Sequence, residues 1–396
     1  MPAISSSPMP SGLEQLARTH SPQPLPDAVC LARFLAGLPD PRARRGRRFP
    51  LIAIVAAAAA SVLAGARSLT AVTEWIADAP CSALLALGFS IDPFSKTVTV
   101  PHPTTVMRLL GRLDGDALDA AVSAFLQTRG ESVQSGRRLR AVAVDGKVLR
   151  GSRSAGGKAV WLLAAMDHTG TVLGQSQIDD KSNETPAFIP LLTGINLQNT
   201  VITADAAHTQ HANGTWLREH NAHYIAVVKA NRPSLLGRLK KLPWRDIRLD
   251  HYDQTSGHHR IEIRRLKAAV FRHLDYPGAC QALQVVRWRK DLTSEKISIQ
   301  GLYFVTSHPV GAASGAELAG WIRGHWKIEN QLHHVRDTTF TEDASRIRSG
   351  GLPRTMATLR NLAISVFRQD GRTNIAAACR HTARHPQRPL RALGIS

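Results

Sequence analysis

Three acidic residues stand at positions from which their carboxylates could act together on a metal ion. Asp145 closes the apolar run AVAV, Asp205 closes the run VITAD, and Glu329 lies inside a long helical pattern. Each has an ordinary alternative. Asp-Gly between alternating hydrophobics is a hairpin signal, an aspartate before a helix is a common N-cap, and most helical glutamates are simply solvated. Taken singly, none of the three identifies a site.

The combination is more informative, because catalytic groups of α/β sheets gather at the carboxyl ends of central strands. Asp145 and Asp205 each follow a buried strand pattern, and a helix can place Glu329 over the same edge. Three carboxylates at one point repel one another unless divalent cations bind, and oxygen ligands select Mg²⁺ or Mn²⁺. A pair of such ions promotes in-line displacement at phosphorus. We therefore predict that Asp145, Asp205 and Glu329 are metal ligands and catalytic residues.

The helix that carries Glu329 is predicted over residues 314–340. Apolar residues at helical spacing predict its core-facing side: Leu318, Trp321, Ile328, Leu332 and Val335. His325, Glu329 and His333 follow one another at i, i+4 and i+8 on the adjoining flank, with Arg336 close behind. We predict that His325, His333 and Arg336 contact DNA beside the metal; the alternative is a row of surface ion pairs. A zinc site from the two histidines is disfavoured, because two helical turns separate them.

The chain is strongly basic. Its 396 residues include 50 Lys and Arg against 30 Asp and Glu, a formal net charge of +20. Nucleic acid is the natural partner, because its phosphates neutralise such an excess and release counterions on binding. A basic protein such as a ribosome-associated factor is the alternative. The stretch DPRARRGRRFP predicts an arm that follows phosphates, although a solvated loop has the same composition. Its arginines are Arg42, Arg44, Arg45, Arg47 and Arg48.

The pattern changes from helical to mixed along the chain. Residues 1–27 are rich in Ser and Pro and predict a flexible tail, and residues 28–130 predict a helical, DNA-binding domain. Residues 138–345 open with three strand patterns and continue with helix and strand in alternation, the arrangement of a ribonuclease H-like α/β catalytic domain. Strand patterns at about 245–308 predict a β-rich insertion in it, and residues 346–396 predict a basic helical tail. The expected fold class is α/β, preceded by an all-α N-terminal domain.

Cysteine and hydropathy patterns argue against several other classes. The four cysteines are scattered and form no CxxC pair, which disfavours a zinc ribbon or a disulfide scaffold and fits a reducing compartment. No basic segment followed by an apolar core opens the chain, so no signal peptide is evident. The apolar stretch 51–66 is Ala-rich and too short to span a bilayer comfortably. We expect a cytoplasmic, nucleoid-associated protein with no membrane partner.

The order AVDGK, TADAAHTQ and GHWKIEN resembles the DDE transposases of bacterial insertion sequences, specifically the H-repeat-associated type. Other stretches follow the same family's pattern in order, among them SVLAGARSLTAVTEWIAD, KSNETPAFIPLL, HYIAVVKANRP and HWKIENQLHHVRDTTFTEDAS. The resemblance runs from about residue 30 to nearly the C-terminus. By position, Asp145 and Asp205 resemble the two aspartates, and Glu329 the glutamate, of that family's catalytic triad.

The resemblance implies a ribonuclease H-like core with a β-strand insertion before the glutamate helix. It implies cutting at element ends and attack of the freed 3′-hydroxyl on target DNA, with two ions of Mg²⁺ or Mn²⁺ as cofactors. One partner would be double-stranded DNA, both the terminal inverted repeats of the element and the target DNA. The other would be a second copy of the chain, with which it forms a homodimer on DNA. Related transposases contact DNA four residues before and seven after the glutamate, positions that here hold His325 and Arg336.

Other polar residues flank the matched motifs. We predict that they bind phosphates or support the carboxylates, with ordinary loop polarity as the alternative: Lys147, Asn183, His208 and Lys229. Two other functions stay open. One is a catalytically degenerate DNA-binding protein derived from a mobile element, for which the basic regions would suffice. The other is a structure-selective nuclease that uses the same triad without strand transfer.

Overall fold

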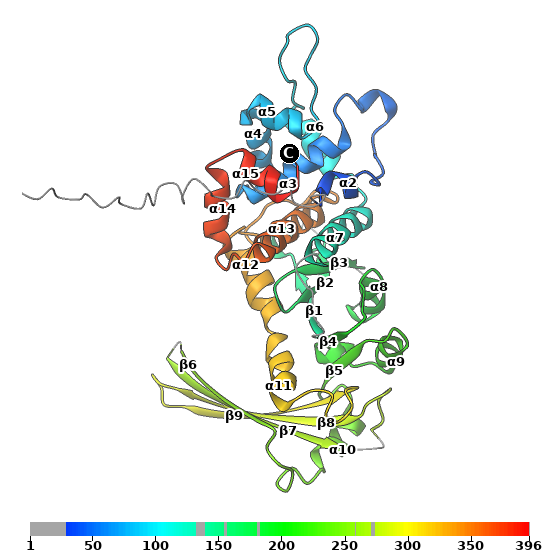
Figure 1. Ribbon diagram of the computed structural model, residues 1–396, viewed down its shortest axis with the longest axis vertical. Helices are drawn as coiled ribbons and strands as arrows, with labels where there is room; N and C mark the ends of the chain where they lie inside the picture. The colour runs from blue at the N-terminus through cyan, green and yellow to red at the C-terminus, as the bar shows by residue number, and fades with distance from the viewer. Residues whose placement is uncertain are drawn as a thin grey trace, which may run out of the picture.

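The computed structural model describes residues 29–131, 139–153, 157–179, 183–257, 259–270 and 274–395. The expected tail over residues 1–27 lies outside the described residues. A helical part stands at one end of a long sheet (Figure 1). The helices before the sheet are α2 (Leu31–Leu35), α3 (Leu51–Leu63), α4 (Leu69–Asp78), α5 (Cys81–Ala86), α6 (Pro103–Leu110) and α7 (Gly115–Glu131). Within the described ranges, no helix combines the length and apolar character that crossing a membrane requires.

The described part of the chain contains one sheet of nine strands, in the order β3-β2-β1-β4-β5-β9-β8-β7-β6. The strands are β1 (Arg140–Val148), β2 (Trp161–Asp167), β3 (Val172–Ile178), β4 (Thr200–Ala204), β5 (His223–Val228), β6 (His251–Gly257), β7 (Arg260–Val270), β8 (Gln281–Asp291) and β9 (Ile297–Thr306). β1 pairs antiparallel with β2 and parallel with β4, and β5 pairs parallel with β4 and antiparallel with β9. The protein is therefore a mixed α/β structure.

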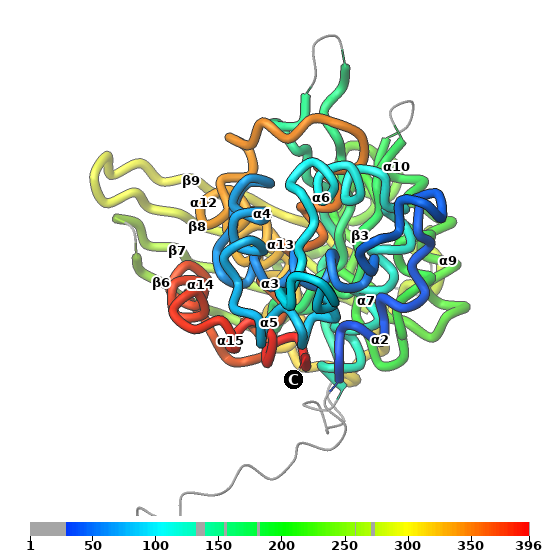
Figure 2. The backbone as a smooth tube through the Cα atoms, turned by 90° about the horizontal axis from the view of Figure 1, so that it is seen from above, coloured from blue at the N-terminus to red at the C-terminus, as the bar shows by residue number. Residues whose placement is uncertain are grey.

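Strands β6 to β9 lengthen the main sheet, because β9 pairs directly with β5. Figure 2, which looks down on the helical part, shows these strands reaching out to one side. The sequence predicts β7, β8 and β9 but not β6. The reason is that β6 has the sequence HYDQTSG, which lacks the apolar alternation by which a half-buried strand is recognised.

Helices cover both faces of the β1–β5 half of the sheet. On one face α7 and α13 (Leu352–Gln369) pack against β3, and Ala143 of β1 joins the core that they form. On the other face Val142 and Val144 pack in a second core with α8 (Phe188–Thr193) and α9 (His211–Glu219). The two-residue period of a strand sends neighbouring side chains to opposite faces, so β1 has apolar residues on both sides. β1 is consequently held rigidly in the middle of the domain.

The C-terminal segment differs from its prediction. Residues 346–396 are predicted to form a basic helical tail; the segment is helical, but α13 is buried along nearly its whole length and packs on α3 and α7. The helices α14 (Ile375–Ala383) and α15 (Gln387–Ala392) also contact α3. Every residue of α3 except Ile52 is buried, and a helix that is apolar all round needs neighbours on every side. One helical body therefore combines both ends of the chain, and the N-terminal helices do not form it alone.

A buried charge cluster ties this helical body to the segment that follows Glu329. The two oxygens of Glu342 accept hydrogen bonds of 2.8 Å from Arg336 Nε and from Arg360 on α13. The exposed fractions are 0% for Arg336 and 2% for both Glu342 and Arg360. Burial alone would raise the pKa of Glu342, but the two guanidinium groups hold it below its usual value. The prediction that Arg336 contacts DNA is wrong, because its guanidinium group is enclosed and paired inside the protein.

Candidate functional site

Asp145 and Asp205 become neighbours through the register of the parallel pair β1 and β4. The last paired residues of these strands are Val144 and Ala204, and each aspartate follows directly. Registered residues of parallel strands point to the same face, so both carboxylates reach the same edge. One detail differs from prediction: Asp145 does not end its strand, because β1 continues to Val148 against β2. Only the parallel pairing of β1 with β4 stops here, directly before Asp145.

Glu329 lies on a segment that is less regular than the predicted helix. α11 (Gly315–Gly324) ends before it, the π-helical segment η5 (Glu329–His333) follows, and α12 (His334–Thr338) completes the run. A π-helix changes the angular spacing of side chains and is found most often at functional sites. Here it leaves Glu329 exposed and its neighbour His333 buried, at 3% exposure. The two residues still contact each other as i, i+4 neighbours, although one is exposed and the other is buried.

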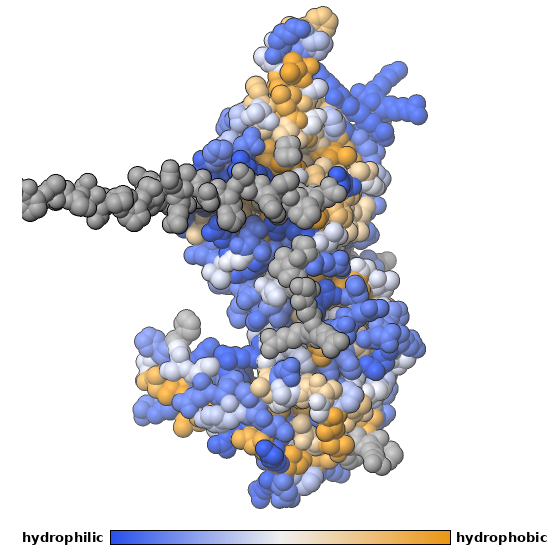
Figure 3. Space-filling view, viewed as in Figure 1, coloured by the Kyte–Doolittle hydropathy of each residue, from blue (hydrophilic) through white to orange (hydrophobic). Residues whose placement is uncertain are grey.

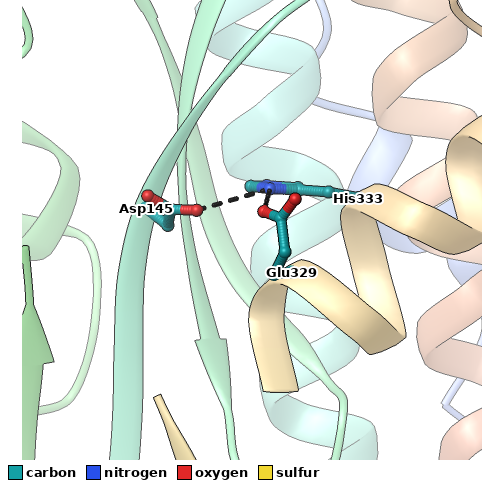
Figure 4. Close-up of side chains that lie close together, drawn as sticks. All are labelled: Asp145, Glu329 and His333. Atoms are coloured by element: carbon teal, nitrogen blue, oxygen red, sulfur yellow. Dashed lines mark hydrogen bonds and ion pairs between the residues drawn. The ribbon is translucent and has the colours of Figure 1, made fainter. Parts of the chain in front are cut away.

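Asp145, Glu329 and His333 form the closest group of potential metal ligands in the described residues. One atom of each lies within 4.8 Å of the others. His333 Nδ1 is 3.1 Å from Glu329 Oε2 and 3.5 Å from Asp145 Oδ2, and Figure 4 shows the imidazole between the two carboxylates. The prediction that His333 contacts DNA is wrong, since the ring is buried and faces the carboxylates. The i, i+4 spacing predicts that His333 lies beside Glu329, as observed, but its approach to Asp145 was not predicted.

Asp205 lies near this group but contacts other partners. Asp205 Oδ1 accepts a hydrogen bond from the Ala206 N–H at the start of η4 (Ala206–His208), so it also serves as an N-cap. The same oxygen lies 3.1 Å from Lys229 Nζ, and both side chains are half-exposed. A cavity of about 380 Å³ is lined by Asp145, Asp205 and Glu329 together with Lys229. The structure thus brings all three predicted carboxylates to one cavity, with two of them in the closest group.

The charges of this cavity influence one another. Burial raises the pKa of Asp145, against the effect of His333 and His325. The hydrogen bond with His333 lowers the pKa of Glu329. Burial lowers the pKa of His325, although Asp145 and Asp205 act to raise it. His325 Nδ1 lies 3.2 Å from the hydroxyl oxygen of Thr203, which orients the ring at the cavity wall. A partly buried carboxylate with a raised pKa gains most from a bound cation.

The donor set fits a divalent cation. Two carboxylate oxygens and one imidazole nitrogen converge within 4.8 Å, with a third carboxylate, Asp205, on the same cavity. Hard oxygen donors favour Mg²⁺ or Mn²⁺, and a single histidine is compatible with either ion. The predicted zinc alternative from His325 and His333 gains no support, because His333 groups with carboxylates and His325 lies outside that group.

A fourth acidic side chain, Glu184, faces this region and was not predicted. It lies at the end of a loop before η3 (Thr185–Ala187), and its carboxylate is close to the backbone of Gly146. Burial, followed by the negative charges of Asp145 and Asp205, raises the pKa of Glu184. In sequence, Glu184 stands in KSNETP, where a polar run before Pro reads as an ordinary helix start. Only the tertiary structure, which places the carboxylate near Gly146 of β1, brings Glu184 to this region.

Two other residues predicted to contact DNA, Lys147 and Arg42, have acidic partners within the protein. Lys147 Nζ is bonded to Asp337 at 2.7 Å, and the side chain is only 10% exposed. Arg42 is 9% exposed, bonds to both oxygens of Asp40 and donates to the Phe49 carbonyl. Both side chains fix local structure instead of reaching outward.

The other predicted cations remain accessible. Arg44, Arg45, Arg47 and Arg48 are exposed around the short helix η1 (Arg44–Gly46). Arg48 is 70% exposed although Asp92 lies 3.9 Å away, and Arg47 is 47% exposed. Figure 3 shows a hydrophilic projection at the end of the molecule that carries the helices. We call the stretch from Arg44 to Arg48 the arginine arm. Lys229 is exposed to a similar degree beside Asp205.

A basic groove that the sequence does not predict adjoins the site. It has a volume of about 760 Å³ and lies between strands β6–β9 and α11, where Figure 3 shows the molecule hollowed. Its cationic lining residues are Arg260, Arg264, Arg287, Arg289, Arg323 and Lys327, against the acids Asp253 and Glu262. Arg287 and the 60% exposed Trp326 also line the carboxylate cavity, so the two hollows adjoin and share these side chains. Arg264 on β7 is paired with Arg287 on β8, and paired residues of neighbouring strands point to the same face of the sheet. Both side chains therefore line the groove.

Comparison with known families gives two matches in tandem. Residues 136–366 match the family described as Transposase DDE domain, which covers more than half of the chain. Residues 32–126 match the family described as DDE_Tnp_1-associated. The three predicted carboxylates all fall within the first match.

Individual relatives are more distant. "Putative transposase YncI" of Escherichia coli O157:H7 is 29% identical over 286 residues, which cover 68% of this chain and 71% of that protein. "H repeat-associated putative transposase YhhI" of Escherichia coli K12 is 27% identical over 249 residues, covering 58% of this chain and 64% of that protein. A piggyBac transposase synaptic complex with hairpin DNA aligns with a TM-score of 0.39 and 10% identity, over 89% of this chain and 74% of that one.

Proposed function

The chain belongs to the transposase DDE domain family, and on that premise we propose that it cuts and joins DNA phosphodiesters at the cavity described above. The observation that carries the proposal is the convergence of Asp145, Glu329 and His333 within 4.8 Å, on a cavity that Asp205 also lines. A group of carboxylates of this kind is better suited to bind a divalent cation than to bind any other ligand. We assign Asp145, Asp205 and Glu329 as the catalytic and metal-binding residues.

The sheet supports a more specific fold assignment as part of the same proposal. Strands β3-β2-β1-β4-β5 form a meander of three antiparallel strands followed by two parallel ones. We assign these strands and α7 to α9 to a ribonuclease H-like core, with β6 to β9 as the insertion that precedes the Glu329 segment. The alternation of strands and helices along the chain after residue 200 supports this assignment.

The reaction that we propose is an in-line displacement at phosphorus. When bound, Mg²⁺ or Mn²⁺, as one or two ions, would neutralise charge on the phosphate and on the attacking and leaving oxygens. A water oxygen forms the new bond to phosphorus, the bond to the 3′ oxygen breaks, and the released 3′ oxygen takes a proton. The freed 3′-hydroxyl then attacks a target phosphodiester in the same manner. Lys229 and His325, on the cavity wall, would hold phosphate oxygens in place.

DNA is the proposed partner for electrostatic and geometric reasons. The net charge of +20 favours a polyanion, and the basic groove adjoins the carboxylate cavity. The arginine arm offers a second basic surface at the other end of the molecule. We expect two copies of the chain to act together on DNA, because an element has two ends to be processed.

The test is cleavage of DNA that carries the inverted repeats bracketing the gene. We expect nicks at the repeat ends, followed by joined products, with Mg²⁺ or Mn²⁺ present and neither product in EDTA. Cut ends without joined products would instead favour the structure-selective nuclease. Salt-sensitive binding without cleavage under any divalent metal would favour the degenerate DNA-binding protein.

Removing the charges of the arginine arm should weaken DNA binding and its dependence on salt. A variant with glutamine at Arg44, Arg45, Arg47 and Arg48 would lower the slope of log affinity against log salt concentration by about 3–4, at roughly 0.9 per lost phosphate contact. The measurement is fluorescence anisotropy of labelled duplex DNA over a salt series.

The matched control removes four exposed cations near α10 (Pro233–Lys240), at the opposite end of the molecule. These residues are Lys240, Lys241, Arg245 and Arg248. If the control lowers the slope as much as the arm variant, general charge and not the arm controls binding.

A further inference from the structure

The loop between α5 and α6 projects beyond the helices at one end of the molecule (Figure 1). We call residues 91–98 of this loop the tip hairpin. The N–H of Asp92 donates to the Thr97 carbonyl at 2.8 Å, and Asp92 Oδ1 accepts hydrogen bonds of 2.9 Å from the N–H groups of Phe94 and Ser95. Phe94 is therefore held at the tip of a fixed turn.

Phe94 is the most exposed large apolar side chain in the described ranges, at 94%, and Ile297 follows at 65%. Its neighbours Pro93, Ser95 and Lys96 are exposed as well. The ring contributes nothing to the core, whereas contact with a partner would remove a large apolar area from water. A single exposed apolar side chain is not unusual in itself, so the surroundings of the ring decide what it could bind.

The arginine arm lies against the base of the tip hairpin. Arg48 Nη2 is 3.9 Å from Asp92 Oδ2, and the Phe49 ring packs edge-on against that of Phe89, just before the hairpin, with centroids 6.5 Å apart. The arm contributes four exposed arginines, and Lys96 adds an exposed cation beside the tip. The exposed ring consequently stands beside a cationic surface.

Stacked base pairs between two phosphate strands match this combination of features. Proteins that bend DNA insert single apolar side chains such as phenylalanine between base pairs, while cations nearby hold the phosphates. A protein partner fits less well, because a stable interface buries about 1,200 Å² or more and the tip offers one ring. A membrane also fits less well, because binding to its surface uses an extended apolar face.

We propose that the tip hairpin inserts Phe94 between two base pairs of the DNA that the arginine arm contacts, and that it kinks the duplex there. Lys96 and the arm then face the phosphates next to the opened step. The inference rests on the proposed function, from which it takes DNA as the partner. The binding site that it assigns is separate from the carboxylate cavity, whose lining includes no residue of the tip hairpin.

The first test measures affinity on the full chain, with a fluorescently labelled duplex that carries a terminal inverted repeat. Phe94→Ala should weaken binding by at least about fivefold, the lower limit for loss of one contact between an aromatic ring and a base. The slope of log affinity against log salt concentration should stay within about 0.5 of wild type, because a phenyl ring makes no phosphate contact. Phe94→Trp keeps a flat aromatic ring and should bind within about twofold of wild type.

Val310→Ala is the matched control, because it removes a 61% exposed apolar side chain from the turn between β9 and α11 (Gly315–Gly324). It should bind the duplex as wild type does. Phe94→Ala should melt within about 2 °C of wild type, because an exposed ring adds no packing. A loss of affinity smaller than fivefold, or one that Val310→Ala shares, would overturn the proposal.

The shape of the bound DNA provides a second test. 2-Aminopurine, placed at successive positions of the duplex, should become brighter at one step with wild type, because the base there is unstacked, and not with Phe94→Ala. Energy transfer between dyes at the two duplex ends should rise with wild type, because a kink brings the ends together. Weaker binding of Phe94→Ala with neither signal in wild type would show that the ring touches DNA without entering the stack, which refutes the proposal.

These outcomes separate the inference from the proposed function. If wild type binds no duplex DNA, the proposed function itself is contradicted. If wild type binds and Phe94→Ala binds equally well, only the role of Phe94 is overturned. Sedimentation with vesicles of phosphatidylserine and phosphatidylcholine that depends on Phe94 would assign the ring to a membrane instead. A dimer that forms without DNA and is lost in Phe94→Ala, observed by analytical ultracentrifugation, would assign it to a second copy of the chain.

Discussion

Asp145→Asn is expected to slow Mg²⁺-dependent nicking of DNA by about a thousandfold or more, while DNA affinity stays within a few-fold of wild type. The asparagine keeps the size of the side chain but removes the charge that faces Glu329 and His333. Loss of about 4 kcal/mol of metal-derived stabilisation of the transition state corresponds to three powers of ten in rate. Single-turnover nicking of a supercoiled plasmid measures the effect.

The matched control for Asp145→Asn removes one aspartate charge at an exposed position elsewhere in the chain. Asp78 is exposed at the end of α4, so Asp78→Asn should nick at the wild-type rate. An Asp145→Asn variant that keeps more than a tenth of wild-type activity would remove Asp145 from the site. Anisotropy of labelled DNA, measured on the same preparations, shows whether a lost rate reflects lost binding.

Glu342→Gln is the substitution that should cost most stability. It leaves Arg336 and Arg360 buried without their shared carboxylate, and an uncompensated buried charge costs about 3–5 kcal/mol. We expect scanning calorimetry to show a melting temperature lower by several degrees. Because Arg336 lies directly after the segment that carries Glu329, nicking should fall as well. The exposed control Glu219→Gln should change the free energy of unfolding by no more than about 0.5 kcal/mol.

The same carboxylate predicts how stability depends on pH. Burial would raise the pKa of Glu342, but Arg336 and Arg360 keep it below its ordinary value of 4.5. Its stabilising contribution is therefore complete above pH 4.5 and is lost as the pH falls through the lower folded value. Melting curves between pH 3 and 7 should show a steeper acid loss in wild type than in Glu342→Gln. Parallel curves would mean that Glu342 does not stay ionised in the folded protein.

Local pattern was enough to predict most of the elements that carry the site. Alternating apolar residues mark β1, and the run VITA marks β4, because strand burial has a two-residue period. The resemblance to DDE transposases is confirmed by the family match over residues 136–366. β6 was missed because its side chains are polar, and pairing with β7 rather than its own hydrophobicity holds it in the sheet.

The partners of charged side chains were the least predictable feature. Lys147, Arg42 and Arg336 all appear in sequence as cations available to DNA, and each is paired inside the fold. Their acidic partners are near in space, and an ion pair forms wherever the backbone brings opposite charges together away from water. Composition cannot distinguish such a residue from a truly exposed one such as Arg48.

By itself, the sequence determined the family, the basic character and the three carboxylates on their expected strands and helical segment, because these follow from residue order and short-range periodicity. Only the tertiary structure decided that His333 turns inward between Asp145 and Glu329, and that Glu184 approaches Gly146 from a distant loop. It also decided that the last helices close around α3. These contacts join residues far apart in the chain, and they depend on which buried surfaces and charges the whole fold must satisfy at once.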